Sequence, residues 1–142
     1  VEGHGKVLFD LINNNVLEQR QTFFVHGGVD AEDREKVREI TEKENNAIIV
    51  ASYGTFSTGI NIRNLHNVIF ASPSKSRIRN LQSIGRVLRK GNNKTKATLY
   101  DIADDATYKS RRNYTLNHLI ERLKIYNYEK FNYEIINISL KK

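Results

Sequence analysis

Three polar side chains lie on one face of the helix that the sequence predicts at residues 76–89. At about 100° per residue, Gln82, Arg86 and Arg89 fall within about 60° of one another, opposite the apolar side of the helix. An arginine fork donates two directed hydrogen bonds and keeps its charge, so this face suits a polyphosphate. Gly85 costs about 1 kcal/mol relative to alanine in mid-helix and indicates close approach by another group. The alternative interpretation is a solvent-exposed face.

The same helix lies in a stretch of sequence that carries only positive charge. Between residues 75 and 96 there is no Asp or Glu, and the cations are Lys75, Arg77, Arg79, Arg86, Arg89, Lys90, Lys94 and Lys96. The net charge of the whole chain is +7. Cations without acidic i,i+4 partners favour phosphate as a ligand, and we expect Lys75, Arg77 and Arg79 to contact nucleic acid.

A second candidate site is the sequence SYGTFSTGIN at residues 52–61, which follows an apolar run of strand length. Gly54 and Gly59 allow the backbone to approach a ligand closely. Ser57 and Thr58 offer hydroxyl groups, and backbone N–H groups nearby can also meet phosphate oxygens. The alternative is a plain strand-to-helix turn, which uses the same residue types.

These two features together resemble motifs V and VI of superfamily 2 helicases. The pattern Q-x-x-G-R-x-x-R at residues 82–89 resembles motif VI, and Thr58 and Gly59 match the core of motif V. In that family both motifs lie in the second RecA-like lobe, and motif VI faces the ATP bound by the first lobe. Asn61 stands where many members carry Asp, so the chain departs from the pattern there.

The resemblance implies a role for each residue. Arg86 and Arg89 would be catalytic and contact the γ-phosphate, one of them as an arginine finger that is typically worth about 10³–10⁵ in rate. The residues implied at the ATP interface are Gln82, Gly85, Gly59 and Asn61. Those expected at the nucleic acid are Gly54, Ser57 and Thr58 from the resemblance, Lys75, Arg77 and Arg79 from their charge, and His26 from its place at the end of a strand. For His26, which ends a strand in Val-His-Gly-Gly, a role in the turn is the favoured interpretation and the nucleic-acid contact is the other.

A closer similarity, to phage recombination helicases, covers most of the chain. It runs through residues 4–12, 51–59, 64–66, the motif VI helix and residues 129–133. Helicases of that kind are ATP-driven and remodel branched DNA such as junctions, forks and R-loops in recombination and repair. The resemblance therefore implies ATP and Mg²⁺ as cofactors, DNA as a partner, and the cytoplasm of the host cell as the location.

The elements that position these sites follow an α/β pattern. Strands are predicted at residues 22–25, 47–51, 66–71, 97–102 and 133–140, and helices at residues 6–14, after Asp30, at 76–89 and around 116–123. Apolar runs that alternate with helices indicate buried parallel strands. The expected fold is a three-layer, RecA-like domain with a mainly parallel sheet and no Walker A sequence of its own. In such folds ligands meet the carboxyl ends of the strands.

We expect residues 1–142 to be a single lobe cut from a longer protein, because the first residue is Val1 and its first strand looks truncated. The sequence has no G-x-x-x-x-G-K-[ST] and no DEAD-like box, so the isolated chain should not hydrolyse ATP. The first RecA-like lobe of the same polypeptide would hold most of the ATP and Mg²⁺. The isolated domain is expected to be monomeric.

Other features predict structure rather than chemistry. The chain has no Cys, its four histidines lack metal-ligand spacing, and Asp104-Asp105 is expected to be a loop rather than a metal site. No apolar run approaches the ~20 residues of a membrane span, so no membrane partner is expected. Core packing is expected of the aromatic residues near the C-terminus, which are Tyr114, Tyr126, Tyr128, Phe131 and Tyr133, with base stacking as the alternative.

Two other functions remain open at this point. The first is a nucleic-acid-binding or annealing module that works by charge without ATP, because the chain is basic and lacks a phosphate loop. The second is a lobe of an RNA helicase, because the motifs do not distinguish DNA from RNA.

Overall fold

The computed structural model describes residues 2–16, 19–55, 62–71 and 96–140. Its elements follow in the order α1 (Glu2–Asn15), β1 (Thr22–Val25), α2 (Ala31–Lys43), β2 (Ile48–Ala51), β3 (Asn67–Phe70), β4 (Thr98–Asp101) and α5 (Tyr114–Tyr128). Each of these strands and helices was predicted from the sequence, and the prediction is confirmed for all seven. The helix predicted at residues 76–89 lies outside the described residues.

The strands of the described residues form two parallel pairs. In the first, β1 runs beside β2 with Thr22 opposite Ile48. In the second, β3 runs beside β4 with Asn67 opposite Thr98. The expected α/β fold with parallel strands is therefore confirmed, although these four strands are hydrogen-bonded as two pairs rather than as one continuous sheet.

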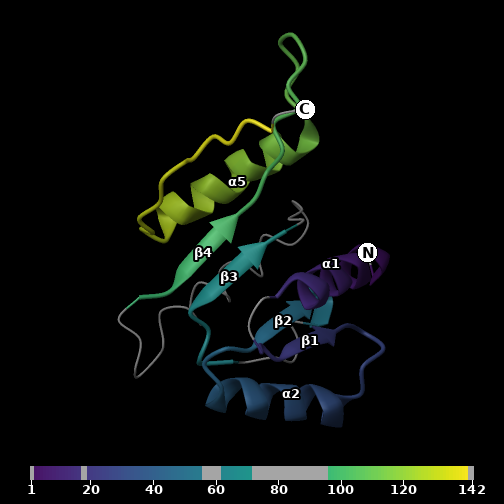
Figure 1. Cartoon of the computed structure of the whole chain (residues 1–142). Helices are drawn as coiled ribbons and strands as arrows, with labels where there is room; N and C mark the ends of the chain where they lie inside the picture. The colour runs from purple at the N-terminus through teal and green to yellow at the C-terminus, as the bar shows by residue number, and fades with distance from the viewer. Residues whose placement is uncertain (1, 17–18, 56–61, 72–95, 141–142) are drawn as a thin grey trace.

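Helices cover both faces of the first pair, with α1 on one side and α2 on the other (Figure 1). The alternation of side chains along β1 explains this arrangement. Phe24 faces α1, where its ring stacks 5.8 Å from that of Phe9. Val25 is 1% exposed and forms a core with Ile62, against which Val37 of α2 packs. The first pair is thus the middle layer of a helix–sheet–helix arrangement.

A glycine permits the close contact between α1 and β1. A Cβ atom at Gly5 would lie 2.9 Å from Cε2 of Phe24, closer than real Cβ atoms come to another heavy atom. The Phe24 ring cannot easily give way, because it lies between the rings of Phe9 and His26. At Gly3, two residues earlier, a Cβ atom would meet nothing within 4 Å. Gly5 is therefore required by packing and Gly3 is not.

The second pair packs on α5. Phe70 of β3 and Tyr126 of α5 form its buried core, joined by the half-buried Leu99 and Leu123. The ring of Tyr53, just after β2, lies 5.7 Å from the ring of Phe70 at the end of β3. This contact brings the carboxyl ends of β2 and β3 together, and so connects the two strand pairs at the edge where ligands bind in such folds.

Charged pairs lie on the solvated face of α2. Lys36 pairs with Glu32 and Asp33, and Arg38 pairs with Glu35. Asp30 stands at the N-cap position of α2, but its side chain makes no capping hydrogen bond.

The strand predicted at residues 133–140 is wrong, because the described chain is irregular from residue 131 to residue 140. Alternation of apolar residues suits a strand only where a neighbouring strand supplies hydrogen bonds, and none of the described strands pairs with this segment. Its apolar side chains are exposed, with Ile138 at 79% and Leu140 at 88%.

The expected core packing of the C-terminal aromatic residues holds only in part. Tyr126 is buried, and Phe131 packs against it. Tyr133 is 45% exposed, yet its ring lies 6.1 Å from that of Tyr126. For Tyr114 and Tyr128 the expectation is wrong, because they project from the two ends of α5 and are 83% and 81% exposed. None of the described helices is long and apolar enough to cross a membrane.

Candidate functional site

The carboxyl edge of the strands begins with a short turn after β2. The N–H of Ser52 donates to the carbonyl of Val25 at 3.1 Å, which extends the contact between β1 and β2 by one residue. The hydroxyl groups of Ser52 and Thr55 are hydrogen-bonded to each other at 2.8 Å, and Thr55 is 4% exposed. These two hydroxyls therefore fix the beginning of the predicted motif V loop.

The far end of that loop is anchored by Ile62, which is fully buried, and by Asn64. The side-chain amide of Asn64 donates to the carbonyls of Thr41 and Glu44 at 3.4 and 3.2 Å, and so binds the loop to the C-terminal end of α2. The described chain thus holds both ends of residues 56–61. Four predicted site residues lie between these anchors and outside the described residues: Ser57, Thr58, Gly59 and Asn61.

Gly54 lies within the described part of the loop, in a helical turn. The positive-φ backbone that favours glycine is absent there, and a Cβ atom would meet nothing within 4 Å. The described fold therefore does not itself require glycine at this position. The open space beside its Cα atom is compatible with close approach by a ligand, and the nucleic-acid contact stays a prediction.

His26 takes part in the turn after β1. Its Nδ1 atom accepts a hydrogen bond from the N–H of Gly28 at 3.1 Å, and its ring lies 4.9 Å from that of Phe24. The favoured interpretation, a role in the turn, therefore has a structural basis. A contact between His26 and nucleic acid remains a prediction.

The predicted arginine face and its flanking cations lie outside the described residues. They are Gln82, Gly85, Arg86, Arg89, Lys75, Arg77 and Arg79. The structure describes the chain on both sides of residues 72–95, the segment that carries these side chains. Ala71 follows the carboxyl end of β3, and Lys96 precedes the amino end of β4.

A buried polar cluster joins the carboxyl end of β4 to α5, and the sequence analysis missed it. Asp101 accepts hydrogen bonds from Nε and Nη2 of Arg122 at 2.7 and 2.8 Å, and from the hydroxyl of Tyr126 at 2.6 Å. The Arg122 side chain is 1% exposed and that of Asp101 is 10% exposed. Burial, followed by the hydrogen bond to Asp101, raises the pKa of the Tyr126 phenol well above its usual range. The cluster holds α5 at a fixed position over the second strand pair.

One signal in the sequence could have indicated this cluster. Arg122 stands between Leu119 and Tyr126 at spacings of three and four, so it belongs to the buried face of the helix rather than to its solvated face. A charged residue on a buried face needs a partner. That partner, Asp101, ends an apolar strand, where a lone carboxylate is also unusual.

The acidic pair after β4 lies in a loop, as expected. The carboxylate of Asp105 accepts hydrogen bonds from the N–H and hydroxyl of Thr107, and these bonds lower its pKa. The described residues contain no group of three or more His, Cys, Asp or Glu side chains that could hold a metal ion.

Comparison with known proteins gives the family. The model of the helicase conserved C-terminal domain matches residues 5–91. The ATP-dependent DNA helicase uvsW of Enterobacteria phage T4 is 45% identical over 147 residues, which cover 96% of this chain and 29% of that protein. The chain thus spans less than a third of the relative's length, and no solved structure matches it. The chain belongs to the helicase C-terminal domain family and is similar to the second RecA-like lobe of superfamily 2 helicases.

Proposed function

We propose that this chain is the second motor lobe of an ATP-dependent DNA helicase that remodels branched DNA in recombination and repair. The observation that carries the proposal is the 45% identity to a protein named as an ATP-dependent DNA helicase, over 96% of this chain. The family match also includes both sequence motifs, because it extends over residues 5–91. The relative comes from a phage, which favours the cytoplasm of a host cell as the place of action.

In this proposal the chain contributes half of an ATP site. Arg86 and Arg89 contact the γ-phosphate, and one of them stabilises the charge that develops during phosphoryl transfer. Gln82, Gly85, Gly59 and Asn61 line the interface with ATP. ATP and Mg²⁺ are bound mainly by a first RecA-like lobe, because this sequence has no Walker A pattern.

The nucleic acid lies against the carboxyl edge of the strands. Gly54, Ser57, Thr58 and His26 approach it from the loops after β2 and β1, and Lys75, Arg77 and Arg79 contact phosphates. The described fold supports this placement in one respect. The turn at residues 52–55 and the anchor at Asn64 fix both ends of the loop that carries Ser57 and Thr58.

Substitution of the two arginines in the two-lobe protein tests the proposal. Arg86→Ala and Arg89→Ala should each abolish ATP turnover, by about 10³-fold or more for the finger, and leave most DNA affinity intact. Lys43→Ala, which removes an exposed cation at the end of α2, serves as the control. Normal ATP turnover by both arginine variants would exclude the assignment.

The net charge of +7 favours a second candidate, a module that binds or anneals nucleic acid without ATP. It predicts that the isolated chain binds DNA strongly and that log K falls steeply with log salt concentration. Comparison of DNA with RNA of the same sequence in the ATP turnover assay separates a DNA helicase from an RNA helicase.

A further inference from the structure

The connection between β4 and α5 ends in a tight turn that projects from the body of the molecule (Figure 1). Tyr108 and Arg111 face each other across this turn, since the N–H of Tyr108 donates to the carbonyl of Arg111 at 3.2 Å and the reverse bond measures 3.0 Å. Lys109, between them, has φ of 54°, a left-handed conformation that costs a non-glycine residue about 1–2 kcal/mol. The backbone of the tip is therefore well defined.

Hydrogen bonds at its base hold the connection in place. The side chain of Asn113 donates to the carbonyl of Asp104 at 2.8 Å and accepts from the N–H of Ala106 at 3.2 Å. The hydroxyl of Thr115, in the first turn of α5, also donates to the carbonyl of Asp104 at 2.8 Å. The projecting tip is thus tied to the end of β4 and to the start of α5.

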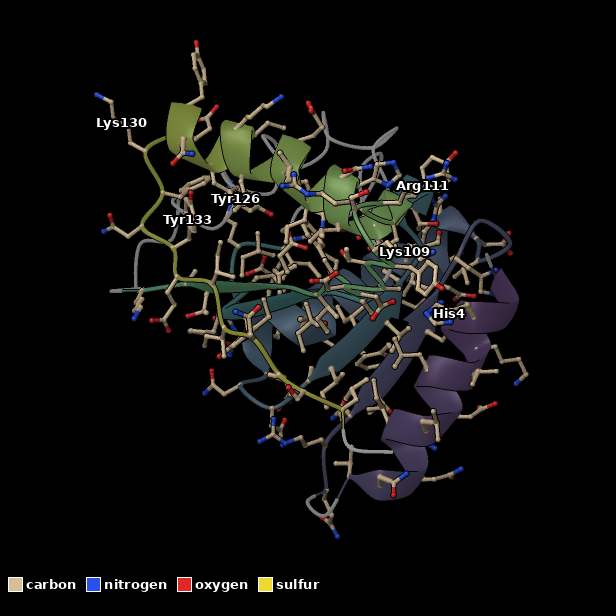
Figure 2. All side chains as sticks on the ribbon, turned by 90° about the horizontal axis from the view of Figure 1, so that it is seen from above. His4, Lys109, Arg111, Tyr126, Lys130 and Tyr133 are labelled. Carbon is tan, nitrogen blue, oxygen red and sulfur yellow. The ribbon has the colours of Figure 1, made fainter. Side chains whose placement is uncertain are left out.

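The tip presents an aromatic ring and positive charge to solvent. Tyr108 is 73% exposed, and the ammonium group of Lys109 lies 5.5 Å from the centre of its ring. Lys109, Arg111 and Arg112 are all exposed, and none of them forms an ion pair with another described residue. The acidic residues of the connection lie at its base, where Asp105 accepts hydrogen bonds from Thr107 and also interacts electrostatically with Arg112. Figure 2 shows Lys109 and Arg111 on the segment before α5, at the end of the helix opposite Tyr126 and Lys130.

We infer that residues 108–112, called here the β4–α5 tip, contact unpaired nucleic acid. Tyr108 stacks on an exposed base, while Lys109, Arg111 and Arg112 contact the phosphates on either side of it. A base has an aromatic face and single strands leave it accessible, so an exposed tyrosine among cations matches a single strand better than a duplex. This inference rests on the proposed function and adds a contact outside the two helicase motifs.

Two observations favour nucleic acid over a protein partner. The tip has one exposed aromatic residue within five residues, whereas a stable protein interface buries about 800 Å² on each partner. The tip also follows the carboxyl end of β4, which is paired with β3. The carboxyl end of β3 in turn contacts Tyr53, in the turn that begins the motif V loop. A single strand of nucleic acid bound along the carboxyl ends of β2, β3 and β4 would therefore also reach the β4–α5 tip.

The test uses the full-length protein with both lobes. The tip variants are Tyr108→Ala, which leaves the backbone hydrogen bonds of the turn intact, and Lys109→Asn with Arg111→Gln. Asparagine tolerates the left-handed conformation at residue 109, so this variant removes charge without disrupting the turn. The other end of α5 supplies matched controls in Tyr128→Ala and Lys130→Asn, because Tyr128 is 81% exposed and Lys130 has φ of 56°.

Affinities are measured with a fluorescent oligothymidine and with a duplex over a series of salt concentrations. Tyr108→Ala should weaken single-strand binding by about 10-fold and duplex binding much less. Lys109→Asn with Arg111→Gln should reduce the slope of log K against log salt by about 1.4, or 0.7 for each lost phosphate contact. ATP turnover without DNA should be unchanged, and the control variants should match the wild type.

Three outcomes would overturn the inference, and they differ from one another. Tip variants that bind single strands as tightly as the controls would remove the tip from the nucleic-acid surface. Loss of DNA-independent ATP turnover in these variants would show instead that the tip contacts the other lobe. A wild-type protein that binds no DNA and hydrolyses no ATP would refute the proposed function itself.

Discussion

Arg122 and Asp101 form a two-pronged ion pair that is almost completely removed from solvent. Its two hydrogen bonds measure 2.7 and 2.8 Å, and it connects residues that are 21 positions apart in the chain. Because the Arg122 side chain is only 1% exposed, water cannot replace a lost partner. The position of α5 on the second strand pair therefore depends on this carboxylate.

Asp101→Asn should lower the free energy of unfolding by about 3–5 kcal/mol, because it leaves the guanidinium of Arg122 buried without a counter-charge. The double variant Asp101→Asn with Arg122→Met removes both charges, and should recover part of that loss. Urea unfolding followed by circular dichroism measures both. A double variant less stable than Asp101→Asn alone would show that the pair acts mainly by packing.

Tyr126→Phe should change how stability depends on alkaline pH. Burial raises the pKa of Tyr126, so the folded protein keeps the phenol proton at a pH where the unfolded chain, with a pKa of about 10, releases it. The unfolded state then binds fewer protons, and stability falls as pH rises above about 10. Tyr126→Phe lacks this contribution, so its free energy of unfolding should decline less steeply from pH 9 to pH 11.

At neutral pH the same variant should lose about 1.5 kcal/mol, the value of one hydrogen bond to a charged group. Asp101 keeps its bonds to Arg122, so no buried charge is abandoned. Tyr114→Phe is the matched control, because Tyr114 is 83% exposed. An alkaline slope of Tyr126→Phe equal to those of the wild type and Tyr114→Phe would contradict the role of burial.

The local sequence pattern was enough to predict β1, β2, β3 and β4, and the reason is physical. A buried parallel strand is apolar on both faces, so a run such as residues 47–51 marks a strand without knowledge of its neighbours. The run at residues 66–71 also marked a strand, although Asn67 and Ile69 of β3 are exposed. The candidate site was harder to predict from the sequence. The motifs are visible in the sequence, but the hydrogen bond between Ser52 and Thr55 and the anchor at Asn64 depend on how the chain folds back on itself.

The wrong strand prediction and the missed polar cluster also arise because they depend on contacts between distant parts of the chain. The segment at residues 133–140 has the alternation of a strand, but its secondary structure depends on a neighbour that no described strand provides. Asp101 and Arg122 are each a charged residue at a position where the local pattern expects an apolar one. Their ion pair in the folded protein explains both. A sequence shows that a polar residue occupies an apolar position, whereas the structure shows which group satisfies it.

Gly5→Ala and Gly3→Ala should change stability in opposite directions. Both glycines lie in α1, where alanine is intrinsically better by up to about 1 kcal/mol. A Cβ atom at position 3 meets nothing within 4 Å, so Gly3→Ala should gain a few tenths of a kcal/mol or more. At position 5 the Cβ atom lies 2.9 Å from the Phe24 ring, so Gly5→Ala should lose about 1–3 kcal/mol through overpacking.

Thermal unfolding of the two glycine variants checks this prediction. The double variant Gly5→Ala with Phe24→Leu provides a further control, because a smaller side chain at position 24 should relieve the clash. Equal stabilisation by Gly5→Ala and Gly3→Ala would mean that α1 can shift away from β1 at little cost.

Substitutions at Asn64 should rank in an order set by charge. Its amide donates to the carbonyls of Thr41 and Glu44 at the C-terminal end of α2, where the helix dipole is negative. Asn64→Ala loses both hydrogen bonds and should cost about 1 kcal/mol. Asn64→Asp places a carboxylate against the same two oxygens, so repulsion adds to the loss and the cost should be larger.

The rank order distinguishes this anchor from a merely polar surface position. Asn132, which is exposed, supplies the control, and its Ala and Asp variants should both stay within about 0.5 kcal/mol of the wild type. Salt should reduce the difference between Asn64→Asp and Asn64→Ala, because it screens charge but not a lost hydrogen bond. If Asp at position 64 proves as stable as Asn, then the amide does not donate to α2. The motif V loop would in that case be anchored at this end by the buried side chain of Ile62 and by the hydrogen bond from the N–H of Arg63 to the carboxylate of Glu42.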